Sequence, residues 1–414
     1  QLRELLIDSG ISMIRRFLAI LSVSTFFLLS LNAQEKVGFG NGTLEVTPMN
    51  GHAVRIRYSE GLDLHLPEFS YIETTSVKHS SFTSADGTMT IRTAEYSVKV
   101  DPSEGTVSVI DRTGSKVFCA DKHSLVREKL YDMDVFSASV DVRTADGEYQ
   151  YGLGQFQDGY TNVRGLTRRL TQVNTQISLP MYVSSKGYGL LWNNLGRTDF
   201  NPPQMTIPLT RVEDSDTGTQ TVDITTTTGG RRELRTGSRF TAEIDIPKSG
   251  KWSLILDCGR TMARRHSLLI DDKPVFDLRN LWLPPTCSAI VYLEAGKHSI
   301  TADMEKDDTP TLGLRMDDGT TVLSSPVADA VDYTVFVGTA DEIVSSYRTL
   351  TGEIPMMPQW ALGYIHCRER YHSSEEIIRN AETFREKQIP LDLIVQDWQW
   401  WGDTGWNSMV FDSK

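Results

Sequence analysis

The segment from residue 360 to residue 414 constrains the fold of this chain more than any other. Two short apolar runs, 360–367 and 391–395, flank a charged segment with the periodicity of an amphipathic helix. Ser373 and Glu376 have the spacing of a capping box at the start of that helix, and Pro390 ends it. A strand, a helix and a strand of these lengths predict a right-handed parallel βαβ unit, with both strands buried on both faces.

Polar and aromatic residues follow the second of these strands directly. Parallel barrels bind ligands at the carboxyl ends of their strands, and Asp397 stands at that position. Five of the eight tryptophans of the chain lie in this segment: Trp360, Trp398, Trp400, Trp401 and Trp406. Aromatic rings stack on the C–H faces of pyranose rings, and a carboxylate accepts hydrogen bonds from hydroxyl groups. The pattern therefore indicates a sugar site, although a loop-capping Asp397 among core tryptophans is an open alternative. Trp360 is expected in the core in either case.

The region before this segment predicts β-structure. Residues 43–47, 53–58, 96–100 and 106–110 alternate apolar and polar side chains and are separated by Gly, Asn and Asp. Short strands at this spacing are typical of an antiparallel β-sandwich, which we assign to residues 34–213 and 329–350.

A second β-sandwich is expected within the first, at residues 214–328. Polar seams at 225–230 and 317–321 bracket a further set of alternating strands, and residues 332–337 then return to the character of the first sandwich. A helix over 341–348 leads to residues 351–414, the start of a barrel.

The N-terminus carries the pattern of an export signal at residues 13–33. Basic residues follow Met13, an apolar run covers 17–31, and Ala33 supplies a small residue at the cleavage point. We expect an exported protein, periplasmic or extracellular; a buried core helix is the alternative. The run is too short for a confident membrane span, and no cysteine follows it, so no membrane anchor is expected.

Composition narrows the class of partner. A net charge of −12 argues against nucleic acid. No metal or cofactor is expected, because His366 and Cys367 are adjacent and point to opposite faces of a strand. Residues 151–154 lack the context of a dinucleotide site and are expected to form a turn. A disulfide between Cys258 and Cys287 is left open, but small buried thiols are the favoured reading.

Several segments together resemble glycoside hydrolase family 31, the retaining α-glucosidases and α-xylosidases. The segments that carry the resemblance are 151–155, 184–194, 347–352, 358–363, 368–371 and 389–397. The resemblance implies a mainly β chain: a galactose-mutarotase-like β-sandwich with an inserted second β-sandwich, then the first strands of a truncated (β/α)8 TIM barrel. The insert resembles the protective-antigen-type β-sandwich and is a candidate carbohydrate-binding domain.

The resemblance also implies a mechanism. Family members cleave terminal α-linked sugars by double displacement with two aspartates, which lie on later barrel strands. A barrel takes about 250 residues, far more than follow Leu350. We therefore expect no catalytic carboxylate before Lys414 and an inactive chain when it is assayed alone.

The residues implied for substrate binding are Asp397, Trp398, Trp400 and Gln176. Asp397 matches the aspartate that binds the sugar in the −1 subsite, and Trp398 would crowd a glucose hydroxymethyl group. Gln176 replaces an acidic residue of a sandwich loop, which puts that contact in doubt. The expected function is retaining hydrolysis of terminal α-xylosidic linkages in xylo-oligosaccharides or xyloglucan-type glycans. An α-glucosidase and a non-catalytic carbohydrate-binding protein are the alternatives, and oligomerisation is left open.

Overall fold

The computed structural model describes residues 28–31, 34–64, 66–68, 70–72, 77–226, 229–406 and 408–413. Most of the expected export signal, 13–33, lies outside these residues. Its described part, strand β1 (Leu28–Leu31), pairs antiparallel with β5 (Lys78–Thr83). A search of the described helices finds none with the length and apolar character needed to cross a membrane.

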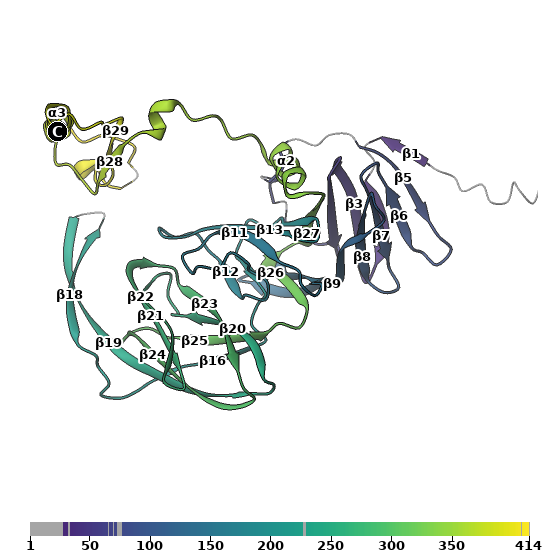
Figure 1. The fold of residues 1–414 in the computed structure, drawn as a ribbon, viewed down its shortest axis with the longest axis horizontal. Helices are drawn as coiled ribbons and strands as arrows, with labels where there is room; N and C mark the ends of the chain where they lie inside the picture. The colour runs from purple at the N-terminus through teal and green to yellow at the C-terminus, as the bar shows by residue number, and fades with distance from the viewer. Residues whose placement is uncertain are drawn as a thin grey trace, which may run out of the picture. The chain divides into compact units, whose positions relative to one another are not determined.

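The chain divides into two compact units, which are described separately. The first combines residues 1–212 and 239–352, and the second combines residues 213–238 and 353–414. The first unit holds both β-sandwiches, and the second holds a hairpin tip and the C-terminal α/β segment (Figure 1).

Two antiparallel sheets form the N-terminal sandwich. Among the described residues, the first sheet has the order β1, β5, β6 (Met89–Arg92), β7 (Tyr96–Asp101), β8 (Thr106–Asp111), β9 (Lys116–Leu130), β10 (Met133–Arg143), β26 (Thr320–Ala328), β15 (Thr198–Phe200) and β12 (Arg168–Leu170). The second has the order β11 (Gln150–Gln155), β13 (Ile177–Ser184), β14 (Tyr188–Trp192), β27 (Ala330–Val337), β4 (Ala53–Ser59), β3 (Gly42–Asn50) and β2 (Glu35–Phe39).

The alternation of apolar and polar side chains along each strand explains why these strands pack into a sandwich. In β7, Tyr96, Val98 and Val100 are buried while the residues between them are not. Each such side chain stabilises the fold by about 1.5–3 kcal/mol when it leaves water. The central strand β27 is buried at every position, as a strand covered on both faces must be. The predicted sandwich is confirmed at all four alternating segments.

The expected turn at 151–154 is wrong, because these residues lie in β11. A side chain at Gly154 would stand 2.2 Å from the carbonyl oxygen of Ile177 on the paired strand β13. Gly154 also has a φ of 104°, which L side chains rarely adopt. The glycines of this segment therefore serve a close strand-to-strand approach within a sheet.

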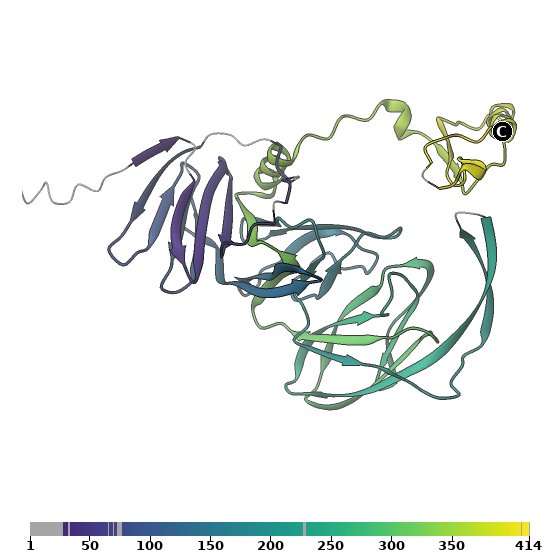
Figure 2. The same cartoon turned by 180° about the vertical axis from the view of Figure 1, so that it is seen from behind.

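The insert is a second sandwich (Figure 2). Among the described residues, one of its sheets has the order β16 (Met205–Pro208), β25 (Thr311–Met316), β20 (Gly250–Asp257) and β23 (Thr286–Leu293). The other has the order β17 (Thr210–Arg211), β19 (Gly229–Ile246), β24 (Gly296–Glu305), β21 (Ala263–Ile270) and β22 (Lys273–Leu283), and β18 (Thr219–Thr226) pairs with β19.

The strand pairing moves the boundaries expected at 214 and 328. β16 pairs with β25 of the insert, whereas β26 pairs with β10 of the N-terminal sandwich. In the first polar seam, Thr225 and Thr226 pair with Gly230 and Gly229 in the β18–β19 ladder, so these residues belong to a strand pair rather than to a domain border. Polar composition marks where the chain turns, but hydrogen bonding between strands decides which sheet it joins.

Helix α2 (Ala340–Thr351) connects the sandwich to the C-terminal segment and confirms the helix expected over 341–348. Thr339 and Glu342 form a capping box at its start. Ile343 and Leu350 are fully buried and pack in one apolar cluster with residues of the seven-stranded sheet.

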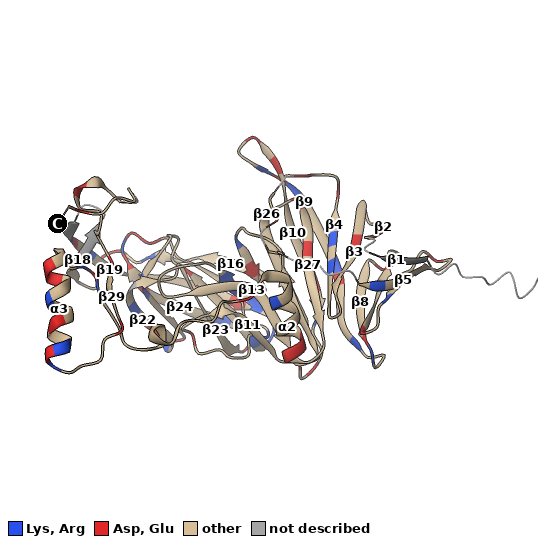
Figure 3. Cartoon of the chain, turned by 90° about the horizontal axis from the view of Figure 1, so that it is seen from above, with Lys and Arg blue, Asp and Glu red and all other residues tan. Residues whose placement is uncertain are grey.

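The C-terminal segment is a βαβ unit. β28 (Ile365–Arg368) and β29 (Leu393–Gln396) pair in parallel, with α3 (Ser374–Glu386) between them along the chain. Acidic and basic positions alternate along the ribbon of α3 (Figure 3). The predicted strand–helix–strand order is confirmed.

Three details of that prediction are wrong. The run 360–367 begins as a short 3-10 helix, η1 (Gln359–Leu362), because the N–H of Gly363 bonds to the carbonyl of Trp360. The strands are not buried: Ile365 and Leu393 are exposed, since β28 and β29 pair only with each other among the described residues. The capping box is also partial, because the carboxylate of Glu376 accepts from the N–H of His372 rather than that of Ser373.

Candidate functional site

The carboxyl ends of β28 and β29 form one edge of the C-terminal unit. The register pairs Arg368 with Gln396, so the residues after each lie next to one another. The N–H of Trp398 donates to the carbonyl of Glu369 at 3.2 Å, which extends this link past the ends of the strands. Asp397, between Gln396 and Trp398, is exposed. Its carboxylate is therefore accessible to a ligand at the edge where parallel barrels bind substrates.

The side chain of Gln396 ties this edge together. Its Oε1 accepts from the N–H of Tyr371 at 3.0 Å, and its Nε2 donates to the carbonyl of Tyr371 at 3.1 Å. Nε2 also donates to the carbonyl of Trp398 at 3.1 Å. These bonds fix the backbone on both sides of Asp397. The sequence analysis did not single out Gln396, although a polar residue at the end of an apolar strand was a signal for it.

The tryptophans predicted around Asp397 gather into one cluster. The ring of Trp398 meets that of Trp401 edge to face at 5.1 Å, and the ring of Trp406 lies 6.1 Å from Trp398. Trp400 packs edge to face on Trp401 at 5.6 Å. Trp401 is 2% exposed, whereas Trp398 and Trp400 are half-buried. The cluster thus has a buried centre and two partly exposed rings.

Trp360 does not belong to this core. It lies in η1, before β28 begins, and is 53% exposed. The expectation that Trp360 is buried is wrong, because the chain turns there instead of running on as a strand. Trp401 is the core tryptophan of this unit.

Gln176 is described in the first unit, separately from Asp397. It is buried, and its Nε2 donates to the backbone carbonyl of Thr171 at 2.8 Å within its own loop. The same side chain lines a cavity of about 150 Å³ that the insert closes from the other side with His266 and Asn280. The structure thus gives Gln176 a role in holding the loop.

Burial governs the titration of the cavity's imidazole. His266 is fully buried, and this burial lowers its pKa. Nε2 lies 2.8 Å from the carbonyl of Pro284, and Nδ1 has no hydrogen-bond partner among the described residues.

The described residues contain no group of three His, Cys, Asp or Glu side chains placed to hold a metal ion. The disulfide left open between Cys258 and Cys287 is not formed, and both are buried free thiols. What the C-terminal edge offers is an exposed carboxylate beside half-buried aromatic rings, a combination that can hold a neutral polyol by hydrogen bonds and stacking.

Comparison with known protein families agrees with this geometry. Residues 354–414 match the glycosyl hydrolases family 31 TIM-barrel domain, and residues 43–201 match the glycosyl hydrolase 31 N-terminal galactose mutarotase-like domain. The chain belongs to glycoside hydrolase family 31. The two matched regions contain most strands of the N-terminal sandwich and the edge that carries Asp397.

Individual members of glycoside hydrolase family 31 are similar over different lengths. An α-xylosidase of Saccharolobus solfataricus is 25% identical over 387 residues, which are 90% of this chain and 37% of that protein. An α-glucosidase of Bacillus thermoamyloliquefaciens is 46% identical over 69 residues, 16% of this chain and 9% of that protein. This chain thus spans well under half the length of these relatives.

A solved structure has the same fold. The crystal structure of a family 31 α-xylosidase from Xanthomonas citri superposes with a TM-score of 0.73 at 24% sequence identity. The superposition covers 92% of this chain and 46% of that protein. The likeness therefore extends over both sandwiches and the C-terminal segment.

Proposed function

We propose that this chain forms the substrate-binding part of a glycoside hydrolase that releases terminal α-linked xylose from xylo-oligosaccharides or xyloglucan-type glycans. The observation that carries the proposal is the position of Asp397 and Trp398 directly after β29, in parallel register with β28. The α-xylosidases of Saccharolobus solfataricus and Xanthomonas citri, similar over nine-tenths of this chain, support the substrate.

Asp397 would accept hydrogen bonds from the hydroxyl groups of the terminal sugar. A carboxylate that accepts from hydroxyls forms stronger bonds than a neutral acceptor, and its exposure leaves both oxygens available. The nucleophile and the general acid/base of the double displacement would be the two aspartates that the family places on later barrel strands. The role of the present chain is then to bind and orient the sugar.

Trp398 would select the sugar by size. Its ring is held edge to face by Trp401, and its backbone is held by Glu369 and Gln396, so it cannot easily move aside. Glucose carries a hydroxymethyl group that xylose lacks. Discrimination of one such group in a pocket is worth about 1–3 kcal/mol, or about 5-fold to 150-fold in kcat/KM.

Paired hydrolysis assays test the proposal. A protein that joins this chain to a complete family 31 barrel should hydrolyse an aryl α-xyloside with a higher kcat/KM than the matching aryl α-glucoside. Retention of the anomeric configuration should accompany turnover, as double displacement requires. A higher kcat/KM on the α-glucoside would contradict the proposal.

That second outcome would support an α-glucosidase. The 46% identity of residues in this chain to an α-glucosidase of Bacillus thermoamyloliquefaciens favours this alternative, although it covers only 16% of the chain. The same pair of substrates separates the two functions.

We also propose that the protein is exported, on the basis of the basic, apolar and small-residue pattern at 13–33. Mass spectrometry of the mature protein from its own cells should find an N-terminus at Gln34. Retention of residues 13–33 in the mature protein would contradict export by this signal.

A further inference from the structure

A groove of about 590 Å³ lies at the junction of the two sandwiches. Its size falls in the range of about 300–1,000 Å³ that small-molecule sites occupy. The N-terminal sandwich and the insert both contribute side chains: Tyr149, Tyr160, Asn162 and Arg164 from the first, and Lys251 and Tyr292 from the second. None of these residues takes part in the site around Asp397.

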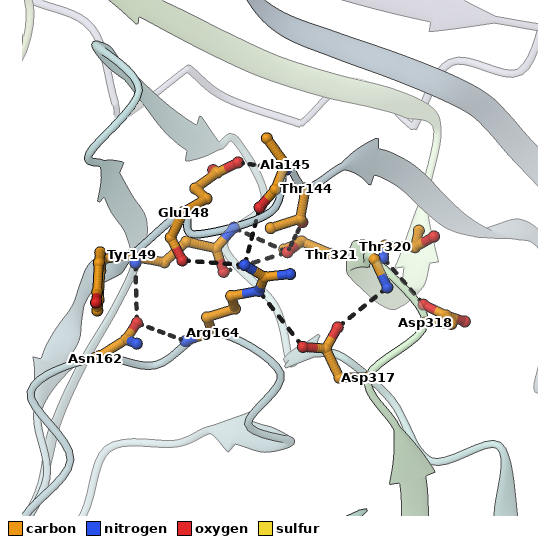
Figure 4. Close-up of polar contacts among 12 residues, drawn as sticks. Thr144, Ala145, Glu148, Tyr149, Asn162, Arg164, Asp317, Asp318, Thr320 and Thr321 are labelled. Atoms are coloured by element: carbon orange, nitrogen blue, oxygen red, sulfur yellow. Dashed lines mark hydrogen bonds and ion pairs between the residues drawn. The ribbon is translucent and has the colours of Figure 1, made fainter. Parts of the chain in front are cut away.

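Arg164 lines the groove and is bound within the protein by hydrogen bonds and an ion pair. Nη1 of Arg164 donates to the carbonyl oxygens of Ala145 at 2.9 Å and Glu148 at 3.3 Å. Nε of Arg164 lies 3.4 Å from a carboxylate oxygen of Asp317 (Figure 4). The guanidinium charge of Arg164 is thus paired within the protein, which weakens its attraction for an anion.

Hydrogen bonds cross from one wall of the groove to the other. The hydroxyl oxygen of Tyr160 accepts from the N–H of Ile290 in the insert at 2.8 Å. Nearby, the N–H of Thr167 donates to Oγ of Ser253 at 2.7 Å. The two sandwiches are therefore fastened together at the groove, so a ligand would meet a preformed site and lose less free energy to ordering it.

Exposed aromatic rings stand on both sides. Tyr149 is 51% exposed and stacks on Tyr151 with ring centroids 6.5 Å apart and planes 14° from parallel. Tyr292 is 63% exposed and is the cross-strand partner of Lys251 in the β20–β23 pair. Solvent-exposed rings of this size around a cleft are typical of binding sites.

Polar groups complete the lining. Oδ1 of Asn162 accepts from the N–H groups of Gln150 at 3.0 Å and Arg164 at 3.2 Å, and Figure 4 shows Asn162 between Tyr149 and Arg164. These bonds orient its amide, whose Nδ2 group has no hydrogen bond within the described residues. The hydroxyl group of Tyr160 can still donate, since its oxygen only accepts from Ile290.

We propose that this groove is a second glycan-binding site, which holds an uncharged oligosaccharide by stacking on Tyr149 and Tyr292 and by hydrogen bonds to Asn162 and Tyr160. A polyanion is disfavoured, because Arg164 is paired with Asp317 and the whole chain carries a net charge of −12. The choice of xyloglucan as the glycan rests on the proposed function. The assignment of the groove as a binding site is independent of the proposed function.

The test measures binding of soluble xyloglucan to the 414-residue chain by affinity gel electrophoresis and isothermal titration calorimetry. Tyr149→Ala and Tyr292→Ala should each weaken binding about tenfold, the loss of one well-packed aromatic contact. Tyr131→Ala is the matched control, because Tyr131 is 92% exposed and does not line the groove. Unchanged thermal midpoints would show that all three variants fold.

Asp397→Asn separates this site from the one at the strand ends. Because Asp397→Asn can itself weaken binding at the strand ends, the tyrosine variants are also measured in that background, where Tyr149→Ala and Tyr292→Ala should each weaken the remaining xyloglucan binding about tenfold. Loss of binding in Asp397→Asn with no change in the tyrosine variants would overturn the inference and leave the proposed function standing. Binding that depends on the tyrosines, in a protein whose complete-barrel form does not hydrolyse α-xylosides, would support the groove and reject the proposed function. Self-association of the chain that Tyr292→Ala abolishes, without glycan binding, would assign the groove to a second copy and overturn the inference.

Discussion

In the proposed function, single residues after β29 decide which sugar binds, and the ring of Trp398 is the most direct case. In a complete-barrel protein, Trp398→Ala should raise the ratio of kcat/KM for aryl α-glucoside to that for aryl α-xyloside by about 10-fold to 100-fold, because it opens space for the hydroxymethyl group. Trp360→Ala is the matched control, since Trp360 lies in η1, before β28, and is 53% exposed. A ratio that stays within twofold in Trp398→Ala would rule out a size filter at this ring.

Gln396 should act on the sugar through its neighbours. Gln396→Ala removes the bonds to Tyr371 and Trp398, so we expect KM for the α-xyloside to rise about tenfold and the preference for xylose to weaken. Gln396→Glu keeps the acceptor for the N–H of Tyr371 and should give an intermediate preference. A purely structural role would lower the thermal midpoint without changing the ratio between the two substrates.

The sequence predicted Asp397, Trp398 and Trp400 because strand ends are visible as the place where an apolar run stops. It did not predict Gln396, because the partners of an amide lie in another loop and have no fixed spacing in the sequence. It also assigned Trp360 to the core, since local apolar character cannot distinguish a strand from a 3-10 turn. Contacts between segments far apart in the sequence could not be predicted from local patterns.

At the scale of elements, the N-terminal sandwich has a mostly buried imidazole, that of His123, that should make it sensitive to acid. Nε2 of His123 lies 2.8 Å from the hydroxyl of Tyr333, and Nδ1 is buried without a hydrogen-bond partner among the described residues. Burial lowers the pKa of His123 from 6.5 to about 4. The folded protein therefore resists protonation at a pH where the unfolded chain accepts it.

The sign of the effect follows from this difference in pKa. The contribution of His123 to stability is complete above pH 6.5 and is lost as the pH falls toward 4, by at most about 3 kcal/mol. The measurement is the urea midpoint of unfolding between pH 7.5 and 4.5, which should fall toward acid pH; we call this fall the acid limb. His123→Phe should make the acid limb shallower. His372→Gln, at an exposed histidine, should leave the limb unchanged. An unchanged acid limb in His123→Phe would show that other groups carry the sensitivity.

Helices and strands were predicted well where the alternation of apolar and polar residues was regular. Domain boundaries were predicted poorly where they depend on which strands pair. The sandwich strands and α2 follow from alternation and capping, which are local. The borders at 214 and 328 were displaced because β16 and β26 join their sheets through partners more than a hundred residues away. The composition of a segment does not show which distant strand it pairs with.

At the scale of the whole molecule, the proposed function assigns substrate binding to these 414 residues. The 414-residue chain assayed alone should bind xyloglucan yet show no hydrolysis of an aryl α-xyloside, because the family's two catalytic aspartates belong to later barrel strands. The same hydrolysis assay is then repeated after addition of the purified remainder of a family 31 barrel, and the two rates are compared. Hydrolysis by the chain alone would show that catalytic carboxylates lie within it.

The central claim is that Asp397 binds the terminal sugar at the end of β29. The most direct measurement is kcat/KM for an aryl α-xyloside in a complete-barrel protein, with and without Asp397→Asn. Loss of the charged acceptor should lower kcat/KM by at least about 100-fold, since a charge-assisted bond in the transition state is worth about 3 kcal/mol. A kcat/KM within a factor of three of the unmodified protein would contradict the account.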